Sequence, residues 1–150
     1  MSNEMARIAQ LHAQGFHCSQ ILVILGLEQQ GKTNPDLVRA MTGLAGGLGF
    51  TGRVCGALTG AVCLLGLYAG RGEVEERENH LLNAMIEQLV DWFDERFGKE
   101  YGGADCEVIL QDDPWNKLTR CPGLVTECYV KAKELLEENG FMPSADNAAD

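Results

Sequence analysis

Apolar side chains recur along this chain at intervals of three and four residues, the spacing that places them on one face of an α-helix. This pattern predicts helices over residues 3–14, 18–29, 35–48, 54–70, 73–97, 104–110 and 122–138. Glycine, proline and aspartate interrupt the pattern between these segments, and no segment shows the alternation typical of a β-strand. We therefore expect an all-α fold, a single compact multi-helix bundle.

The segment 54–70 contains no charged residue and is bracketed by Arg53 and Arg71. A membrane span needs about 20 predominantly apolar residues, whereas this segment is shorter and is interrupted by glycines. Gly56 and Gly60 lie one helical turn apart, so they form a face of small side chains that lets another backbone approach closely. We expect this glycine-rich apolar helix to lie at the centre of the bundle, without membrane insertion.

The segment 73–97 has the clearest helical periodicity. Its apolar stripe consists of Leu81, Leu82, Met85, Ile86, Leu89, Val90, Phe93 and Phe97. Gly98 suits the position just after the C-terminus of a helix. Because the predicted helix is long for a small domain, we consider it a candidate interface of a homodimer.

The length of 150 residues fits one domain, which we place at residues 1–142, followed by a polar tail at 143–150 that we expect to be disordered. The net charge is −10, from 12 basic and 22 acidic residues. Nucleic acids and anionic membranes are bound by basic surfaces, so this charge argues against both as partners. The N-terminal sequence lacks the apolar segment of a secretory signal, and we therefore expect a cytoplasmic protein.

Gly47, Gly49 and Gly52 match the pattern G-x-G-x-x-G of dinucleotide-binding loops. Such a loop follows a β-strand in a βαβ unit, whereas a helical pattern precedes it here, so the sequence does not favour nucleotide binding. We expect this glycine-rich stretch to form a loop or a loosened helix end. In that arrangement the backbone amides of the three glycines and of Gly56 lie close to a site near Cys55.

The three histidines, His12, His17 and His80, are scattered along the chain. They match neither a Ser-His-Asp order nor the pattern H-E-x-x-H, and no C-x-x-C or C-x-x-C-H motif is present. We interpret each histidine as a surface or helix-cap residue. His17 is distinguished only by its position directly before Cys18.

The six cysteines make up 4% of the chain, too few for a small disulfide scaffold. Cys63 and Cys128 lie on apolar stretches and are expected to be small buried hydrophobic residues. The other four lie at predicted helix starts or breaks: Cys18, Cys55, Cys106 and Cys121. A helix N-terminus lowers the pKa of a thiol. These thiols could bind one soft metal or an iron–sulfur cluster, form a dithiol/disulfide pair, or be buried without meeting.

The hexapeptide Cys55–Gly60 together with the three other cysteines resembles the hallmark of the C-GCAxxG-C-C family of redox-active proteins. The flanking stretches Gly46–Gly49, Leu65–Gly70 and Phe93–Gly98 support the resemblance. It implies that the hallmark residues of this chain are Cys18, Cys55, Cys106 and Cys121. A similar segment occurs in split-Soret cytochromes, which also hold an iron–sulfur centre, although this chain lacks their haem motifs.

The leading hypothesis is a redox or electron-transfer protein that binds an iron–sulfur cluster through these four cysteines and serves a redox partner of unknown identity. The glycine-loop amides would donate hydrogen bonds to sulfur and help to set the potential. In one alternative, the protein exchanges thiols and disulfides, with Cys55 as the low-pKa nucleophile and another cysteine resolving it. Structural zinc bound by four cysteines and a helical interaction module with inert thiols are further alternatives. The sequence implies no specific enzyme activity.

Overall fold

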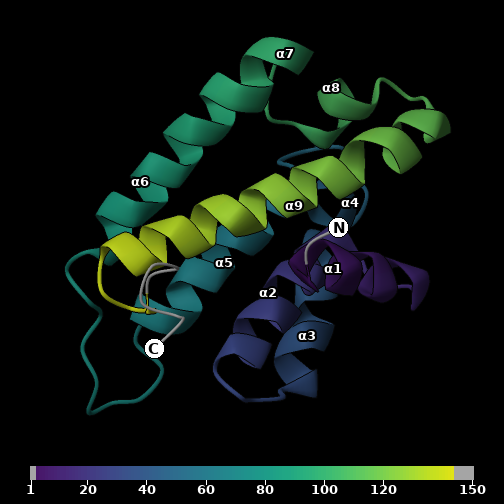
Figure 1. Cartoon of the computed structure of the whole chain (residues 1–150). Coiled ribbons are helices and arrows are strands. Elements are labelled where there is room, and N and C mark those ends of the chain that lie inside the picture. The colour runs from purple at the N-terminus through teal and green to yellow at the C-terminus, as the bar shows by residue number, and fades with distance from the viewer. Residues whose placement is uncertain (1–2, 144–150) are drawn as a thin grey trace.

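The computed structural model describes residues 3–143 and consists of helices joined by loops (Figure 1). The elements are α1 (Asn3–Ala13), α2 (Cys18–Gln29), α3 (Pro35–Met41), a 3₁₀ turn (Thr42–Leu44), α4 (Ala45–Leu48), α5 (Gly56–Ala69), α6 (Leu82–Phe93), a π-helical turn (Asp94–Gly98), α7 (Lys99–Tyr101), α8 (Cys106–Leu110) and α9 (Pro114–Glu138). The all-α expectation is confirmed. The expected disordered tail lies outside the described residues, except for Pro143.

Helix α5 packs against α2, α6 and α9, which surround it. Figure 1 shows α9 running across the molecule over α5, with α6 and α7 on one side and α1, α2 and α3 on the other. The fully buried side chains of the core include Leu64 and Leu65 of α5 and Phe93 of α6. A Cβ atom added at Gly60 would lie only 2.9 Å from the Cα of Ser19, so the absent side chain lets α5 approach α2. Within residues 3–143, no helix is long and apolar enough to cross a membrane.

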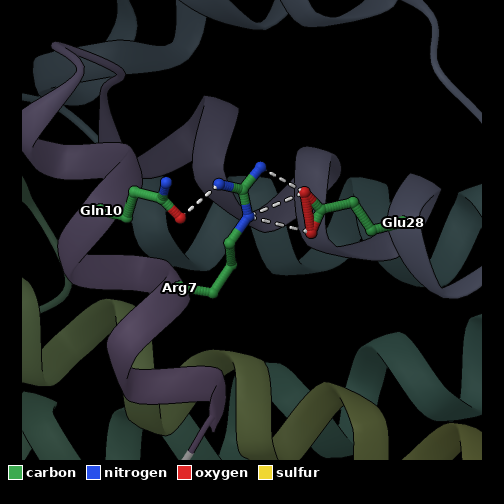
Figure 2. A network of polar contacts seen from close by, with 3 residues as sticks. All are labelled: Arg7, Gln10 and Glu28. Atoms are coloured by element: carbon green, nitrogen blue, oxygen red, sulfur yellow. Dashed lines mark hydrogen bonds and ion pairs between the residues drawn. The ribbon is translucent and has the colours of Figure 1, made fainter.

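Helix α1 is attached to its neighbours by buried apolar residues and two ion pairs. Ile8 and Leu11 are buried in the core. The guanidinium of Arg7 donates hydrogen bonds of 2.5 and 2.9 Å to the carboxylate of Glu28 in α2, and its third nitrogen donates one to Gln10 (Figure 2). The ammonium group of Lys133 in α9 lies 2.5 Å from the carboxylate of Glu4. Because these ion pairs are partly exposed, each contributes at most about 1 kcal/mol, and their main effect is to fix the orientation of α1.

Two predicted helix boundaries are wrong in the middle of the chain. The helix expected over 73–97 begins only at Leu82, and the acidic stretch before it, residues 73–80, packs no side chain into the core. Val74 is 81% exposed there. The helix expected over 35–48 starts at Pro35, where the Asn34 side chain accepts a hydrogen bond from the amide of Leu37, but its regular part ends at Met41.

The last helix begins eight positions earlier than expected, at Pro114 instead of Pro122. The Asp113 side chain accepts a hydrogen bond of 2.9 Å from the amide of Trp115 and thereby caps the helix N-terminus. Pro122 therefore lies inside α9, where its missing N–H removes one helical hydrogen bond. As a consequence, Cys121 lies in the interior of a helix and not at its start.

Candidate functional site

A cavity of about 590 Å³ lies where the beginnings of α2 and α5 meet α8 and the first turns of α9. The cysteines among its lining residues are Cys18, Cys55, Cys106 and Cys121. They come from four separate segments of the chain. Cys63 and Cys128 are outside the lining, and Cys128 is completely buried in the core. The four cysteines singled out in the sequence thus share one cavity, and the two assigned to packing do not line it.

The glycine-rich stretch before Cys55 is an irregular turn in which six residues have positive φ angles. These residues are Gly46, Gly47, Leu48, Gly49, Phe50 and Gly52, with φ between 62° and 79°. A Cβ atom at Gly47 would overlap the backbone of Arg53, whose amide donates a 3.0 Å hydrogen bond to the Gly47 carbonyl oxygen. The turn therefore folds back on itself and delivers Cys55 to the cavity.

Only some of the predicted backbone positions border the cavity. Gly46, Gly52 and Gly56 line it. Gly47 and Gly49 are not among the lining residues. At Gly47 the chain is in close contact with the backbone of Arg53.

Cys55 and Cys106 are brought together by main-chain pairing. Val54 and Asp105 form an isolated antiparallel bridge. On either side of it, the amide of Cys55 donates a 3.0 Å hydrogen bond to the carbonyl oxygen of Ala104, and the amide of Cys106 donates one of 2.5 Å to that of Arg53. This pairing joins the start of α5 to the start of α8 and fixes the positions of both cysteines.

Cys18 is the first residue of α2, and its sulfur occupies space that Gly56 leaves open. A Cβ atom at Gly56 would lie 2.9 Å from the Cys18 Sγ. The next residue anchors the helix start, because the buried Ser19 hydroxyl donates a 2.8 Å hydrogen bond to the Met41 carbonyl oxygen. Gly56 is therefore required by the close approach of Cys18 and not by its own backbone conformation.

Cys121 is held against the other segments by its neighbour in α9. The guanidinium of Arg120 donates a 2.5 Å hydrogen bond to the carbonyl oxygen of Ile109 in α8. The same group lies 4.7 Å from the centre of the Tyr101 ring, in a cation–π contact. These contacts fix the start of α9 relative to α8, next to Cys121 in the cavity lining.

Burial raises the pKa of all four cavity thiols. The pKa of Cys18 rises to about 11 and those of Cys55 and Cys121 to about 12, mainly because burial disfavours the thiolate and secondarily because the thiols repel one another's charge. The pKa of Cys106 is also raised by burial, with Lys117 acting in the opposite direction. The amides of Ala57 and Leu58 at the start of α5 oppose the increase at Cys55 without offsetting it. The expectation of a low-pKa Cys55 is therefore wrong, because desolvation outweighs the helix N-terminus.

Phe50 lines the cavity and is 59% exposed. The ring of His17 contacts the Phe50 ring edge-on, with 5.4 Å between ring centres, and the ammonium group of Lys117 lies 5.5 Å from the Phe50 ring centre. Leu118, which is 69% exposed, also lines the cavity. Acidic residues also line the cavity: Glu107, Asp112 and Asp113.

Comparison with known protein families finds a match over most of the chain. The family model described as "Putative redox-active protein (C_GCAxxG_C_C)" matches residues 16–135, most of the chain. The chain belongs to this family. No match is found among curated proteins or among solved structures.

The segment matched by the C-GCAxxG-C-C family contains all four cavity cysteines, but the cavity extends beyond it. His12 of α1 lines the cavity and precedes the matched residues. Its Nε2 atom is buried and has no hydrogen-bond partner among the described residues. The interpretation of His12 as a surface or cap residue is therefore wrong. A sequence signal existed, because His12 follows Ile8 by one helical turn and so lies on the apolar face of its helix.

The four thiols of this C-GCAxxG-C-C protein surround the cavity without converging on one point. Within residues 3–143, no three His, Cys, Asp or Glu side chains are grouped closely enough to hold a single metal ion. A tetrahedral zinc site requires each sulfur about 2.3 Å from the metal. An iron–sulfur cluster separates its cysteine sulfurs further, because several iron and sulfide atoms lie between them. The described residues thus form no preorganised site for a single metal ion.

Proposed function

We propose that this protein transfers electrons through an iron–sulfur cluster held by Cys18, Cys55, Cys106 and Cys121. The observation that carries the proposal is the common cavity: four cysteines from four separate segments line one space of about 590 Å³. Membership of a family described as redox-active supports it. Four cysteine ligands are also the usual set for such clusters.

The cavity offers what a cluster requires of a protein. A bound cluster would supply one-electron chemistry, while the chain itself provides the sulfur ligands and limits access of water. The fully buried core residues Ile109 and Leu124 form part of the wall, so the site has a low dielectric. The amides of Ala57 and Leu58 act on the Cys55 sulfur in the direction that favours its thiolate form.

The high pKa values of the free thiols have a consequence for loading. Each cysteine must lose its proton to become a ligand, and burial raises the pKa of every cavity thiol. Cluster binding therefore releases protons, and its affinity is expected to increase as the pH rises. The same burial keeps the thiols protonated and unreactive while no ligand is bound.

The proposal is tested by absorption spectroscopy with iron and sulfide analysis on protein purified without oxygen. We expect brown protein with absorption at about 400 nm and stoichiometric iron and labile sulfide. Cys55→Ser should lose the colour and the iron. Cys63→Ser is the matched control, because Cys63 lies on the same helix α5 but outside the cavity, and it should retain both. Colourless, iron-free protein after anaerobic reconstitution contradicts the proposal.

Thiol–disulfide exchange is the second candidate, and one observation favours it. All six cysteines are free thiols in the structure, and four of them border the same space. In this case the protein is colourless, and mild oxidation removes two titratable thiols per chain. The loss of those two thiols should disappear in Cys55→Ser but persist in Cys63→Ser. Stoichiometric zinc without iron would instead indicate a structural metal site.

A further inference from the structure

Three large apolar side chains are exposed together at the four-cysteine cavity. Phe50 and Leu118 line the cavity, and more than half of the surface of each is exposed. Trp115, which is 66% exposed, lies one helical turn before Leu118 and therefore beside it on α9. The ammonium group of Lys117 on the same helix lies over the Phe50 ring and joins the two segments. We call Phe50, Trp115 and Leu118 the apolar cluster; exposed apolar side chains that are grouped in this way mark interaction sites.

The backbone of Phe50 indicates that its ring is not placed there to stabilise the fold. Phe50 has a φ of +64°, a left-handed conformation that costs a residue other than glycine about 1–2 kcal/mol. Glycine adopts this conformation without strain, as Gly47 and Gly49 do in the same turn. Most of the Phe50 surface nevertheless stays exposed, so burial offsets little of this cost. A strained and exposed aromatic side chain is suited to contact with another molecule.

The charges beside the apolar cluster favour a basic partner. Glu107, Asp112 and Asp113 line the cavity, are exposed, and form no ion pair among the described residues. The one ammonium or guanidinium group among the lining residues that the structure describes is that of Lys117. A surface with this excess of carboxylates attracts Lys and Arg side chains. The net charge of −10 acts in the same direction at longer range.

The same charges disfavour two other occupants of this surface. In a symmetric contact between two copies of the chain, the surface would meet itself, and the carboxylates of one copy would lie close to those of the other. An anionic membrane would be repelled in the same way, because such membranes attract basic segments. The charges therefore favour a protein of opposite charge.

We infer that the apolar cluster is the docking surface for a protein that presents Lys or Arg side chains around an apolar side chain. The apolar side chain of the partner packs against Phe50 and Leu118, and its basic groups lie close to Glu107, Asp112 and Asp113. The inference goes beyond the proposed function, because it depends on exposed side chains and not on the group that the cysteines hold. A partner docked there lies next to the cavity that the four cysteines share.

The test measures the binding of a synthetic peptide by isothermal titration calorimetry, with reduced cysteines and no added cofactor. In this peptide, lysines flank a central Phe–Leu pair. We expect the peptide to bind Leu118→Ser and Phe50→Gly at least about fivefold more weakly than the wild type. Val130→Ser is the matched control, because Val130 is an exposed apolar residue of the same helix outside the cavity lining, and it should bind as the wild type does.

The electrostatic part of the inference is tested with salt and with one neutralised carboxylate. Raising the ionic strength from about 0.01 to about 0.15 M shortens the Debye length from about 30 to about 8 Å, so it should weaken binding to the wild type. At the low ionic strength, Asp112→Asn should bind the peptide several-fold more weakly than the wild type. Glu87→Gln on α6, exposed and outside the cavity lining, is the control and should bind unchanged.

Two altered peptides separate the apolar from the charged contribution. A peptide with Ser–Ser in place of Phe–Leu should bind more weakly, and one with glutamates in place of the lysines should not bind. Equal binding to Leu118→Ser and Val130→Ser, or no binding of the original peptide to the wild type at low ionic strength, overturns the inference. Dimerisation of the wild type that Leu118→Ser abolishes would assign the cluster to a second copy and overturn it as well. None of these outcomes bears on the proposed function, whose test measures iron and sulfide.

Discussion

The backbone amide of Cys106 donates a 2.5 Å hydrogen bond to the carbonyl oxygen of Arg53, two residues before Cys55. Two of the four cavity cysteines are therefore positioned by the main chain, through a pairing that joins segments about fifty residues apart in the sequence. The separation of the two thiols depends on the backbone of the glycine-rich turn. Substitutions in that turn should thus change the site without altering any cysteine.

Gly47→Ala should destabilise the fold and weaken the site. The position has a φ of +73°, and an added Cβ atom would overlap the backbone of Arg53, so the pairing with α8 must shift. We expect a loss of at least about 2 kcal/mol in the free energy of unfolding, measured by chemical denaturation. Gly43→Ala is the control, because its φ is not positive and no atom lies within 4 Å of the added Cβ. Equal stability of the two variants would contradict this account of the turn.

Gly60→Ala and Gly66→Ala should have opposite effects on stability although both positions lie on α5. At Gly60 the new methyl group would approach the Cα of Ser19 to 2.9 Å and push α2 away, which should cost about 1–3 kcal/mol. At Gly66 no atom lies within 4 Å, so alanine should stabilise the helix by about 0.5–1 kcal/mol. Thermal unfolding of the two variants measures the difference. Stabilisation by Gly60→Ala would show that α2 and α5 are not in close contact.

The cavity thiols should react slowly with iodoacetamide in reduced protein without a bound cofactor. Burial raises the pKa of Cys55 and Cys121 to about 12, so at pH 8 only a very small fraction is thiolate, the reactive form. We expect alkylation at least about tenfold slower than for a small-molecule thiol, with a rate that continues to rise above pH 9. Mass spectrometry of the labelled peptides measures each site. Unfolding the protein should abolish the difference, and a rate that reaches its plateau below pH 8 would contradict the raised pKa values.

Phe50→Gly should open the cavity without weakening the fold. Phe50 has a φ of +64°, a conformation that glycine adopts without strain, and its exposed ring lines the cavity in contact with the ring of His17. We expect several-fold faster reaction of the cavity thiols with a bulky disulfide reagent, followed by the release of its chromophore. Leu48→Gly is the matched control, because Leu48 has a φ of +67° but is outside the lining. If the thiols react equally faster in both variants, the cause is increased flexibility of the turn and not the loss of the Phe50 ring.

The sequence was sufficient to predict the ends of those helices that are marked by local sequence signals. The boundaries of α2 and the start of α3 were predicted correctly, because an apolar run and the Asn34–Pro35 pair specify them over a few residues. The two long helices were placed wrongly at their N-termini. In α9, Pro122 lies inside the helix but was interpreted as its start. The tertiary packing that stabilises a helix around an internal proline cannot be recognised from the local sequence.

Positions at predicted helix starts left open whether the four cysteines meet, and the family resemblance favoured a common site. The pairing of Arg53 with Cys106 depends on hydrogen bonds between segments far apart in the sequence. Such pairing cannot be predicted from the spacing of apolar residues along the chain. The direction in which the thiol pKa values are shifted could also not be predicted from the sequence. A helix N-terminus near Cys55 is a local property and was recognised, whereas the depth of burial, which dominates the pKa, is set by the packing of the entire bundle.

The position of the cavity cysteines along the chain also sets when the site can exist. Cys18 is synthesised before Cys121, which belongs to α9, the last helix described. A nascent chain that has not yet released α9 from the ribosome lacks one wall of the cavity and one of its four thiols. A short Cys-x-x-Cys motif can receive a metal as soon as it emerges, but this site can be loaded only after its final helix has been synthesised and has packed. Delivery of the proposed cluster is therefore expected to be a step that follows synthesis of α9.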